Sequence, residues 1–535
     1  MTDRPDPRLL GLARDARRGR LSRRRFMQGA LALGASVSSA SALWASKVAA
    51  QTPKRGGLYR VGCHDGNTGD SLDPASTEGV YMIQLNHAIR SWLTQITNED
   101  ALGPDIAESW EASDDATEWR FRLARGAEFH DGKPFTAEDA AASLNHHRGE
   151  ESKSAAKALF EDVEEIRAED PHTLYIRLSA GNADLPYLLT DYHLVMLPSD
   201  GAGGVDWRSG VGTGPYKLVE HEPGVATEMA RHPNWHGEGA WFDGVRMIAL
   251  NDVQARQSAL LTGEVDAITE PDPKTIDLMA RNPGVKITEV PSGAHVTLPM
   301  FSDTPPFDDV NVRNALKLAI DRQAVVETIL FGHGTIGNDQ PIAPIMPFHA
   351  DLPQREYDPE QARALLKKAG MEGLQVSLST ADQAFPGAVD LATLYAEHAK
   401  AAGIDIRVVR EPNDGYWSDV WLKKPFVVVQ WGQRPTPDVI FSLAYKAGAP
   451  WNESHWENAR FNELLSTGKA ELDPARRQAI YAEMQELVRD DGGTVIPFFV
   501  NRVNPMSARI GHDDSIAGNW QLDGARSFER WWFND

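Results

Sequence analysis

Short runs of alternating apolar and polar residues dominate the first half of the chain. The alternation is clear at residues 119–123 and 173–178, where every second side chain is apolar. Such alternation is typical of β-strands with one buried face. Farther on, Asp252 begins a predicted short helix that ends at Gly263, and residues 265–268 predict the next strand. We therefore expect the first half to be rich in β-strands.

The second half changes to an alternation of helices and strands. Apolar residues follow the helical spacing i, i+3, i+4, i+7 and i+8 at Val312, Ala315, Leu316, Ala319 and Ile320. A further helix is predicted to begin at Asp358-Pro359 and to end at Gly370. Helices are also expected up to Gly403, at residues 416–422 and after Asp473, with strands at residues 374–378, 404–409, 426–430 and 494–499. This alternation predicts an α/β domain with a mainly parallel sheet.

The first fifty residues differ from the rest of the chain. They contain ten Lys or Arg and only three Asp, although the whole chain carries a net charge of −22. A basic stretch ends in Ser-Arg-Arg-Arg-Phe at residues 22–26, a moderately apolar run follows, and small residues precede Gln51. We interpret residues 1–50 as a cleaved twin-arginine signal peptide, which implies a periplasmic mature protein. An uncleaved anchor helix is the alternative, and no later segment is apolar for long enough to span a bilayer.

Composition narrows the classes of function. A chain of 535 residues, with 41% hydrophobic and 24% charged residues, predicts a globular protein of two or three domains. The negative net charge argues against nucleic acid as a partner, because a phosphate backbone requires clustered Lys and Arg. The single cysteine, Cys63, excludes an intramolecular disulfide framework and a thiolate metal cluster. We expect this cysteine to be buried.

Two segments match the spacing of a known binding motif, but the elements predicted around them do not fit that motif. The glycines of residues 332–337 match the dinucleotide pattern G-x-G-x-x-G, but they follow a predicted helix instead of a strand and precede prolines instead of a helix. His232 and His236 have a ligand-like spacing, but Pro233 interrupts the helix that would align them. We therefore expect no catalytic site, no metal site and no cofactor.

The loop after the predicted strand 426–430 is the strongest candidate for a ligand site. It leads into a helix start at residues 436–438, and ligands bind at this end of the strands in open α/β sheets. Aromatic side chains, which suit a small-molecule cleft, are frequent in the neighbourhood. The predicted ligand-contacting residues are Gln433, Arg434, Trp431, Trp417, Trp451, Tyr81 and Asn452. A solvated loop is the alternative for the first two, and a core position is the alternative for each tryptophan.

Several segments together resemble the family 5 solute-binding proteins of bacterial ABC importers, the dipeptide-, oligopeptide- and nickel-binding class. They occur in family order across nearly all of residues 55–535. They are Ser-Leu-Asp-Pro at 71–74, Glu-Phe-His-Asp-Gly-Lys-Pro-Phe-Thr-Ala-Glu-Asp at 128–139, Gly-Thr-Gly-Pro-Tyr at 212–216, Phe-Asp-Asp-Val-Asn-Val-Arg-Asn-Ala at 307–315, Ala-Ile-Asp-Arg at 319–322 and Tyr-Asp-Pro at 357–359.

The resemblance implies an α/β, two-lobed periplasmic-binding-protein fold whose lobes are joined by two hinge crossings and close over a ligand in the cleft between them. It places the crossings near residues 296–300 and 494–500. Residues 51–296 and 500–535 would then form lobe I, and residues 297–499 lobe II. The implied protein is a monomeric substrate-binding subunit that captures a small polar solute and delivers it to a membrane ABC permease with its ATPase. A binding subunit for a metal chelate, or a ligand sensor on the same fold, is the alternative.

One position departs from the pattern of the peptide-binding members. Those proteins carry an acidic residue in the loop after the strand, facing the ammonium group of the peptide, whereas this chain has Gln433 followed by Arg434. The arginine that dipeptide binders use for the peptide carboxylate is expected near residues 388–390, where none stands. A buried charge without its partner is costly. We therefore expect a neutral or anionic ligand, such as an opine-like conjugate, a blocked peptide or a small sugar derivative.

Overall fold

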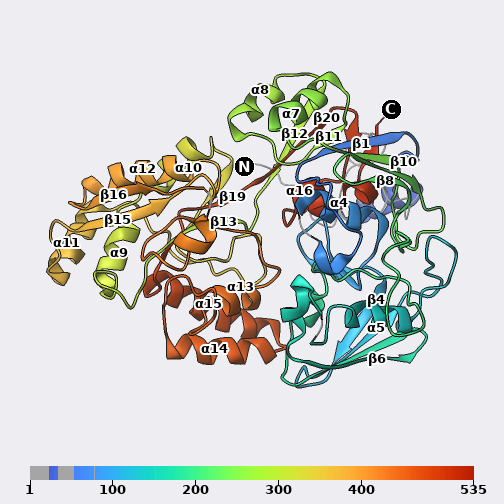
Figure 1. Cartoon of the computed structure of the whole chain (residues 1–535), viewed down its shortest axis with the longest axis horizontal. Helices are drawn as coiled ribbons and strands as arrows, with labels where there is room; N and C mark the ends of the chain where they lie inside the picture. The colour runs from blue at the N-terminus through green and yellow to red at the C-terminus, as the bar shows by residue number, and fades with distance from the viewer. Residues whose placement is uncertain are drawn as a thin grey trace.

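The structure is a computed structural model, and it describes residue 12 and residues 23–33, 53–77, 79–150, 152–413 and 415–534. Figure 1 shows two bodies side by side. One combines the blue-to-green part of the chain with the red C-terminal end, and the other contains the yellow-to-orange part. We call the body formed by residues 53–290 and 502–534 the first lobe, and the body formed by residues 295–500 the second lobe.

The larger sheet of the first lobe has seven strands. In spatial order they are β12 (Val285–Val290), β20 (Arg502–Ser507), β11 (Ala267–Ile268), β1 (Leu58–Cys63), β10 (Gly244–Ala249), β9 (Ala226–Arg231) and β8 (Tyr216–Glu222). Helices that pack on it are α4 (Gly79–Ile89), α7 (Val253–Thr262) and α8 (Ile276–Ala280). Asp252 caps α7 by accepting the N–H of Ala255, and Gly263 ends it with φ at 78°, which confirms the helix predicted there.

The second sheet of the first lobe is antiparallel, in the order β4 (Ala107–Ala112), β5 (Glu118–Leu123), β7 (Thr173–Leu178) and β6 (Val163–Asp170). The strands predicted at residues 119–123 and 173–178 are β5 and β7, and they pair with each other. Trp119, Phe121 and Leu123 alternate along β5 and are buried beneath α5 (Ala137–Asn145), as the hydrophobic pattern predicts.

The C-terminal residues return to the first lobe. β20 runs antiparallel to β12, and Phe528 and Trp531 belong to the core beneath the seven-stranded sheet. The smaller elements of this lobe are the paired strands β2 (Thr94–Ile96) and β3 (Leu102–Pro104), the paired strands β21 (Ile510–Gly511) and β22 (Trp532–Phe533), the helices α6 (Leu185–Leu188), α16 (Gln521–Gly524) and α17 (Ser527–Arg530), and the 3-10 turns η2 (Pro74–Ser76), η3 (Ala155–Phe160) and η4 (Pro273–Thr275).

A mixed sheet forms the centre of the second lobe. β13 (His295–Pro299) pairs antiparallel with β17 (Val429–Trp431), β18 (Thr494–Val495) and β19 (Phe498–Val500), and β19 pairs with β14 (Gly334–Ile336). β15 (Gln375–Thr380) and β16 (Asp405–Arg410) are parallel, and a parallel bridge between Ser379 and Val427 joins them to the strand that leads into β17. The prediction of a mainly parallel sheet is therefore wrong, because β13, β18 and β19 add antiparallel pairs to the α/β portion.

Helices flank this sheet, and Figure 1 shows α10 (Arg322–Ile329) and α12 (Ala388–Lys400) on one side of β15 and β16, with α9 (Val310–Leu318) and α11 (Pro359–Ala369) on the other. The predicted helix at residues 358–370 is confirmed as α11, capped by Asp358 and ended by Gly370 with φ at 69°. The remaining elements are the π-helical turn η5 (Tyr416–Val420) and the helices α13 (Pro437–Ala444), α14 (Ala459–Ala470) and α15 (Pro474–Asp490).

The chain passes between the two sheets twice, and the two passages lie next to each other. Residues 291–294 lead from β12 into β13, and Asn501 alone separates β19 from β20. His295 lies opposite Phe499 on one side of the passages, and β12 pairs with β20 on the other. The passages fall a few residues before the predicted segment 296–300 and directly after the predicted segment 494–500. That they act as hinges stays a prediction.

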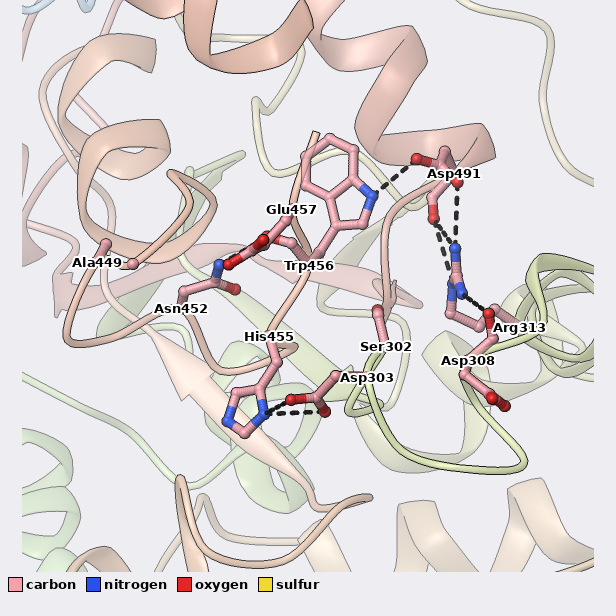
Figure 2. A pocket seen from close by; sticks show the side chains of 11 residues that line it. Ser302, Asp303, Asp308, Arg313, Ala449, Asn452, His455, Trp456, Glu457 and Asp491 are labelled. Atoms are coloured by element: carbon pink, nitrogen blue, oxygen red, sulfur yellow. Dashed lines mark hydrogen bonds and ion pairs between the residues drawn. The ribbon is translucent and has the colours of Figure 1, made fainter. Parts of the chain in front are cut away.

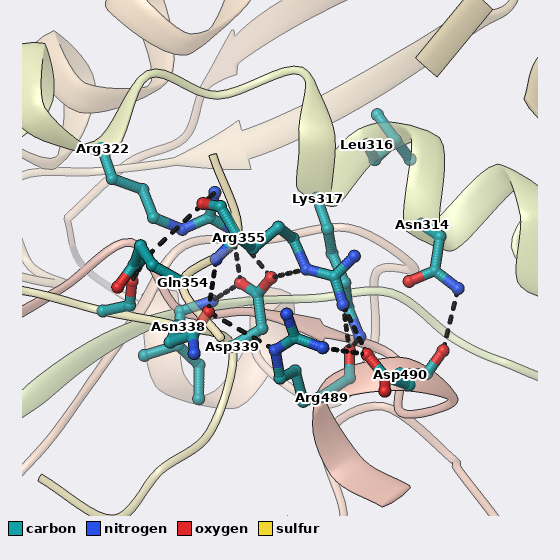
Figure 3. Close-up of polar contacts among 12 residues, drawn as sticks. Asn314, Leu316, Lys317, Arg322, Asn338, Asp339, Gln354, Arg355, Arg489 and Asp490 are labelled. Carbon is teal, nitrogen blue, oxygen red and sulfur yellow. Dashed lines mark hydrogen bonds and ion pairs between the residues drawn. The ribbon is translucent and has the colours of Figure 1, made fainter. Parts of the chain in front are cut away.

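A buried ion network stabilises the second lobe (Figure 3). The Asp339 carboxylate is fully buried and accepts hydrogen bonds from Arg322 at 2.7 Å on both oxygens, while Arg355 approaches it to 2.9 Å. The main-chain N–H of Ile496 also donates to it at 2.9 Å. Burial raises the pKa of Asp339, but the two guanidinium charges outweigh that effect and hold the pKa below its usual range. The carboxylate therefore stays ionised and joins three segments of the lobe.

Candidate functional site

Four tryptophans from three segments form a cluster on the second lobe, which we call the tryptophan cluster: Trp417, Trp421, Trp431 and Trp451. Trp431 ends β17, and its ring centroid lies 6.3 Å from that of Trp421 and 6.0 Å from that of Trp451. Trp417 lies 5.8 Å from Trp421. Trp431 is buried, whereas Trp417 and Trp451 are 39% and 42% exposed. The cluster therefore presents an exposed outer pair of indoles on an inner pair, of which Trp431 is buried and Trp421 is half-buried.

A buried carboxylate, Glu453, anchors the inner pair. The Nε1–H of Trp421 donates to its Oε2 at 2.9 Å, and the Nε1–H of Trp431 donates to its Oε1 at 3.1 Å. The hydroxyl of Thr297 on β13 donates to Oε1 at 2.7 Å. Burial raises the pKa of Glu453, and the three hydrogen bonds oppose that rise. Each of the three donors is thus satisfied by one acidic side chain that is only 3% exposed.

Gln433 and Arg434 follow Trp431 of β17 closely, but their side chains contact different groups. The Oε1 of Gln433 accepts the main-chain N–H of Gly293 at 2.8 Å, which connects this loop to the first passage between the lobes. The guanidinium of Arg434 lies over the Trp431 ring, 5.6 Å from its centroid. Among the described residues, Arg434 has no hydrogen bond and no ion pair, so its N–H donors are available to another group.

The Arg434 guanidinium lies within electrostatic reach of the first lobe. Burial lowers its pKa, and the charges of Tyr192 and Asp191 on the first lobe act in the opposite direction. Tyr192 also contacts Trp520 edge to face, with ring centroids 5.5 Å apart. Through Gln433, which accepts the N–H of Gly293, and through the charges that act on Arg434, this part of the second lobe lies next to the first passage and near the first lobe.

The structure brings together five of the seven predicted ligand-contacting residues. Trp417, Trp431, Trp451 and Arg434 lie in or over the tryptophan cluster, and Gln433 lies beside them. Sequence reasoning missed Trp421 and Glu453. A signal existed for Trp421, because it follows Trp417 by four residues within a predicted helix. The sequence carries no comparable signal for Glu453.

The other two predicted contacts have different surroundings. Tyr81 is fully buried in the core of the first lobe, and its hydroxyl bonds to Thr227 at 2.8 Å. Its assignment to the ligand site is therefore wrong, because helix α4 points it at the seven-stranded sheet. Asn452 is also buried and donates to the main-chain oxygens of Trp456 at 2.8 Å and Lys446 at 3.2 Å. Its amide shapes the loop that carries Trp451 and Glu453.

A cavity of about 560 Å³ is lined in part by residues of that loop (Figure 2). The Nδ1–H of His455 donates to the Asp303 carboxylate at 3.1 Å, and Arg313 bonds to Asp491 at 3.1 Å. The lining residues all belong to the second lobe: Ser302, Asp303, Asp308, Arg313, Gly448, Ala449, Asn452, His455, Trp456, Glu457 and Asp491. This cavity is thus not formed between the lobes, and Asn452 is the one predicted contact that lines it.

The two lobes are joined by ion pairs at a distance from their passages. Arg477 of α15 bonds to Asp184 at 2.7 Å, and both side chains are buried. Lys469 of α14 bonds to Asp162 at 2.6 Å, and its main-chain oxygen accepts the N–H of Ala183. Asp438 is buried near this group, and burial followed by the charge of Asp184 raises its pKa to about 7. The lobes are therefore in contact through one buried ion pair, Arg477–Asp184, and one partly exposed pair, Lys469–Asp162.

Several predictions concern segments that the structure describes only in part. Of the predicted signal peptide, residue 12 and residues 23–33 are described, with α2 at Arg23–Ala32, and the predicted cleavage site after Ala50 lies outside the described residues. Within the described part, no helix combines the length and the apolar character needed to cross a membrane. The described residues also contain no group of three or more metal-ligating side chains. The glycine pattern at 332–337 contains the strand β14, not a phosphate-binding turn.

The chain is similar to a known protein family, to characterised relatives and to solved structures. A family model described as bacterial extracellular solute-binding proteins, family 5, matches residues 101–453. The chain is 30% identical to heme-binding protein A of Haemophilus influenzae, over 76% of this chain and 80% of that protein. It is 26% identical to the peptide transport periplasmic protein SapA of Salmonella typhimurium, over 73% and 77%. The solved structure of AgaA from A. tumefaciens R10, in complex with agropinic acid, matches with a TM-score of 0.71 and 22% identity, over 89% and 99%.

Proposed function

The chain belongs to the bacterial extracellular solute-binding proteins, family 5, and from this premise we propose that it captures a peptide-like or opine-like solute between its lobes and delivers it to a membrane ABC permease. Members of the family bind small ligands and deliver them to such permeases. The ATPase that drives the permease, the monomeric state and the absence of catalysis belong to this proposal. So does export by the twin-arginine pathway, which the residues 22–26 support.

The position of the tryptophan cluster carries the proposal. Arg434 and Trp431 belong to the second lobe, and Tyr192 and Asp191, whose charges act on Arg434, belong to the first. A ligand held there contacts both lobes only when they are closed, so it shifts the equilibrium between open and closed forms toward the closed form. The two adjacent passages are the natural site of the hinge motion, because each is only one to four residues long.

The guanidinium of Arg434, which has no ion-pair partner among the described residues, supports a neutral or anionic ligand. A carboxylate that enters this site can accept charge-assisted hydrogen bonds from it, whereas a free ammonium would meet like charge. Gln433, at the position where peptide binders carry an acid, offers an amide instead of a countercharge. AgaA, whose structure contains agropinic acid, has the same fold. A metal chelate stays the alternative ligand, and solved structures with the same fold contain nickel bound to histidine.

Native mass spectrometry of the protein purified from a periplasm tests the proposal. We expect a co-purified small molecule that is released on mild unfolding, and we expect Arg434→Ala and Gln433→Ala to lower its occupancy. Arg460→Ala, at an exposed position of the second lobe, serves as the control. A bound free dipeptide would contradict the ligand assignment, and unchanged occupancy in both variants would contradict the site. Replacing Arg24 and Arg25 by lysine should block export if the signal is of the twin-arginine type.

A further inference from the structure

Glu453 fixes the two inner indoles of the tryptophan cluster relative to each other. An indole N–H can only donate a hydrogen bond, and a buried one needs an acceptor. Glu453 provides a different carboxylate oxygen for each, Oε2 for Trp421 and Oε1 for Trp431. Because both oxygens belong to one planar group, the two rings cannot change their mutual orientation without breaking a bond.

The outer indoles depend on the inner ones for their positions. Trp451 contacts Trp421 and Trp431, with ring centroids 6.0 Å from each, and Trp417 contacts Trp421. Aromatic pairs in these edge-to-face and tilted arrangements are worth about 0.5–1.5 kcal/mol beyond the area that they bury. Trp417 and Trp451 keep about two fifths of their surfaces exposed, so they can pack against the flat part of a ligand.

Glu453 also acts on Arg434 through the indole between them. Trp431 donates its N–H to Glu453 and presents its ring face to the guanidinium. A carboxylate at the positive edge of an indole adds electron density to the ring, and this strengthens the attraction of the ring face for a cation. The guanidinium is thereby held in place without an acidic partner of its own among the described residues, so its N–H donors stay available to a ligand.

We propose that Glu453 is a positioning residue of the ligand site, which holds the tryptophan cluster and Arg434 so that they select a solute with a flat group next to a carboxylate. This inference rests on the proposed function and adds to it a chemical class of ligand. Glu453 itself does not touch the solute. It acts through Trp421 and Trp431, and its loss changes the preference for the anion and not only the stability of the lobe.

Glu453→Gln tests this role with little change of shape. The amide oxygen can still accept from Thr297 and Trp431, but the amide NH₂ meets the N–H of Trp421, so one donor loses its acceptor and the negative charge disappears. Glu457→Gln is the matched control, because Glu457 is an exposed residue of the same loop and has no hydrogen bond or ion pair within the described part of the chain. The circular dichroism of the coupled indoles reports their mutual orientation in the absence of ligand.

The ligand class is tested by titrating the mature protein with N-acetyl-phenylalanine and with its uncharged amide, which share the flat group and differ in the carboxylate. We expect the wild type to bind the acid about tenfold more tightly than the amide, a difference of about 1.4 kcal/mol. In Glu453→Gln we expect that ratio to fall below about threefold and the indole signal to shrink. Glu457→Gln should match the wild type in both.

The positioning role would be overturned if Glu453→Gln left unchanged both the circular dichroism of the indoles and the ratio of the affinities for the acid and the amide. A wild type that binds the amide as well as the acid, or binds neither at millimolar concentration, would overturn the ligand class. If Glu453→Gln does not fold, Trp421→Phe replaces it, since it removes one N–H donor and keeps the carboxylate, and it should lower the ratio in the same direction. A co-purified solute found alongside such negative results would leave the proposed function standing, so the two failures are distinguishable.

Discussion

The ion pair between Arg477 and Asp184 offers a direct perturbation of lobe closure. Arg477 belongs to α15 of the second lobe and Asp184 directly precedes α6 in the first, and their 2.7 Å contact is shielded from solvent. Arg477→Met keeps an apolar stem of similar length and removes the charge. In the closed form the Asp184 carboxylate is then left buried without its partner, while opening returns it to water.

The magnitude follows from the burial of both partners. Removing one member of a buried ion pair costs about 3–5 kcal/mol, because the remaining charge is uncompensated. Since the open form escapes this cost, the ratio of closed to open protein should fall by about 2 to 3.5 powers of ten, at about 1.4 kcal/mol per power. Affinity for a ligand that requires the closed form should fall in parallel.

Small-angle scattering, together with energy transfer between a dye on each lobe, measures this shift. Arg460→Met is the control, since Arg460 pairs with Glu483 at 2.8 Å on the exposed surface of the second lobe alone. The double variant Asp184→Asn, Arg477→Met should recover much of the closed population, because it leaves no buried charge at this contact. The role of this ion pair in lobe closure would be refuted if Arg477→Met left the closed fraction unchanged. It would also be refuted if the double variant did not restore that fraction.

Three further predictions concern buried titratable groups. Burial, Asp184 and Asp162 raise the pKa of Asp438 to about 7 against the opposing charges of Lys469 and Arg477. Because the closed form then binds the proton more tightly, the closed fraction measured by small-angle scattering should fall as the pH rises from 5 to 8. Asp438→Asn should remove most of this pH dependence. Asp339→Ala leaves the guanidiniums of Arg322 and Arg355 without their buried partner. The free energy of unfolding, measured in urea, should therefore drop by about 3–5 kcal/mol. A drop below about 1 kcal/mol would contradict the stabilising role of the network. Burial raises the pKa of Cys63 to about 12, so iodoacetamide at pH 8 should label it only in denaturant, and rapid labelling of the native protein would show that the core of the first lobe is open.

Local signals in the sequence predicted individual elements well. The helix that begins at Asp358 and ends at Gly370 combines a capping acid, a proline in the first turn and a glycine in a left-handed conformation, each of which acts within a few residues. The strands at residues 119–123 and 173–178 follow from alternation alone. The mixed order of the second lobe's sheet could not be predicted in this way, because the direction of β13 relative to β17 depends on where the chain enters from the other lobe.

Some residues of the candidate site can likewise be predicted from local sequence, and others cannot. The loop after β17 was predicted because its position at the end of a strand is a property of the local sequence, and Trp431, Gln433 and Arg434 do lie together there. Glu453 could not be found, since an acid in a loop is ordinarily solvated and only the folded chain shows two indoles donating to it. Tyr81 was misassigned because an aromatic residue of a helix gives no indication of which side it buries.

The location of the bound solute tests the central claim most directly. A crystal structure of the protein purified with its natural solute from a periplasm should show that molecule between the lobes, with a carboxylate or neutral polar group at the Arg434 guanidinium and a flat part against Trp417 or Trp451. Density for the solute in the cavity beside His455 and Asp303, with nothing at Arg434, would contradict the account.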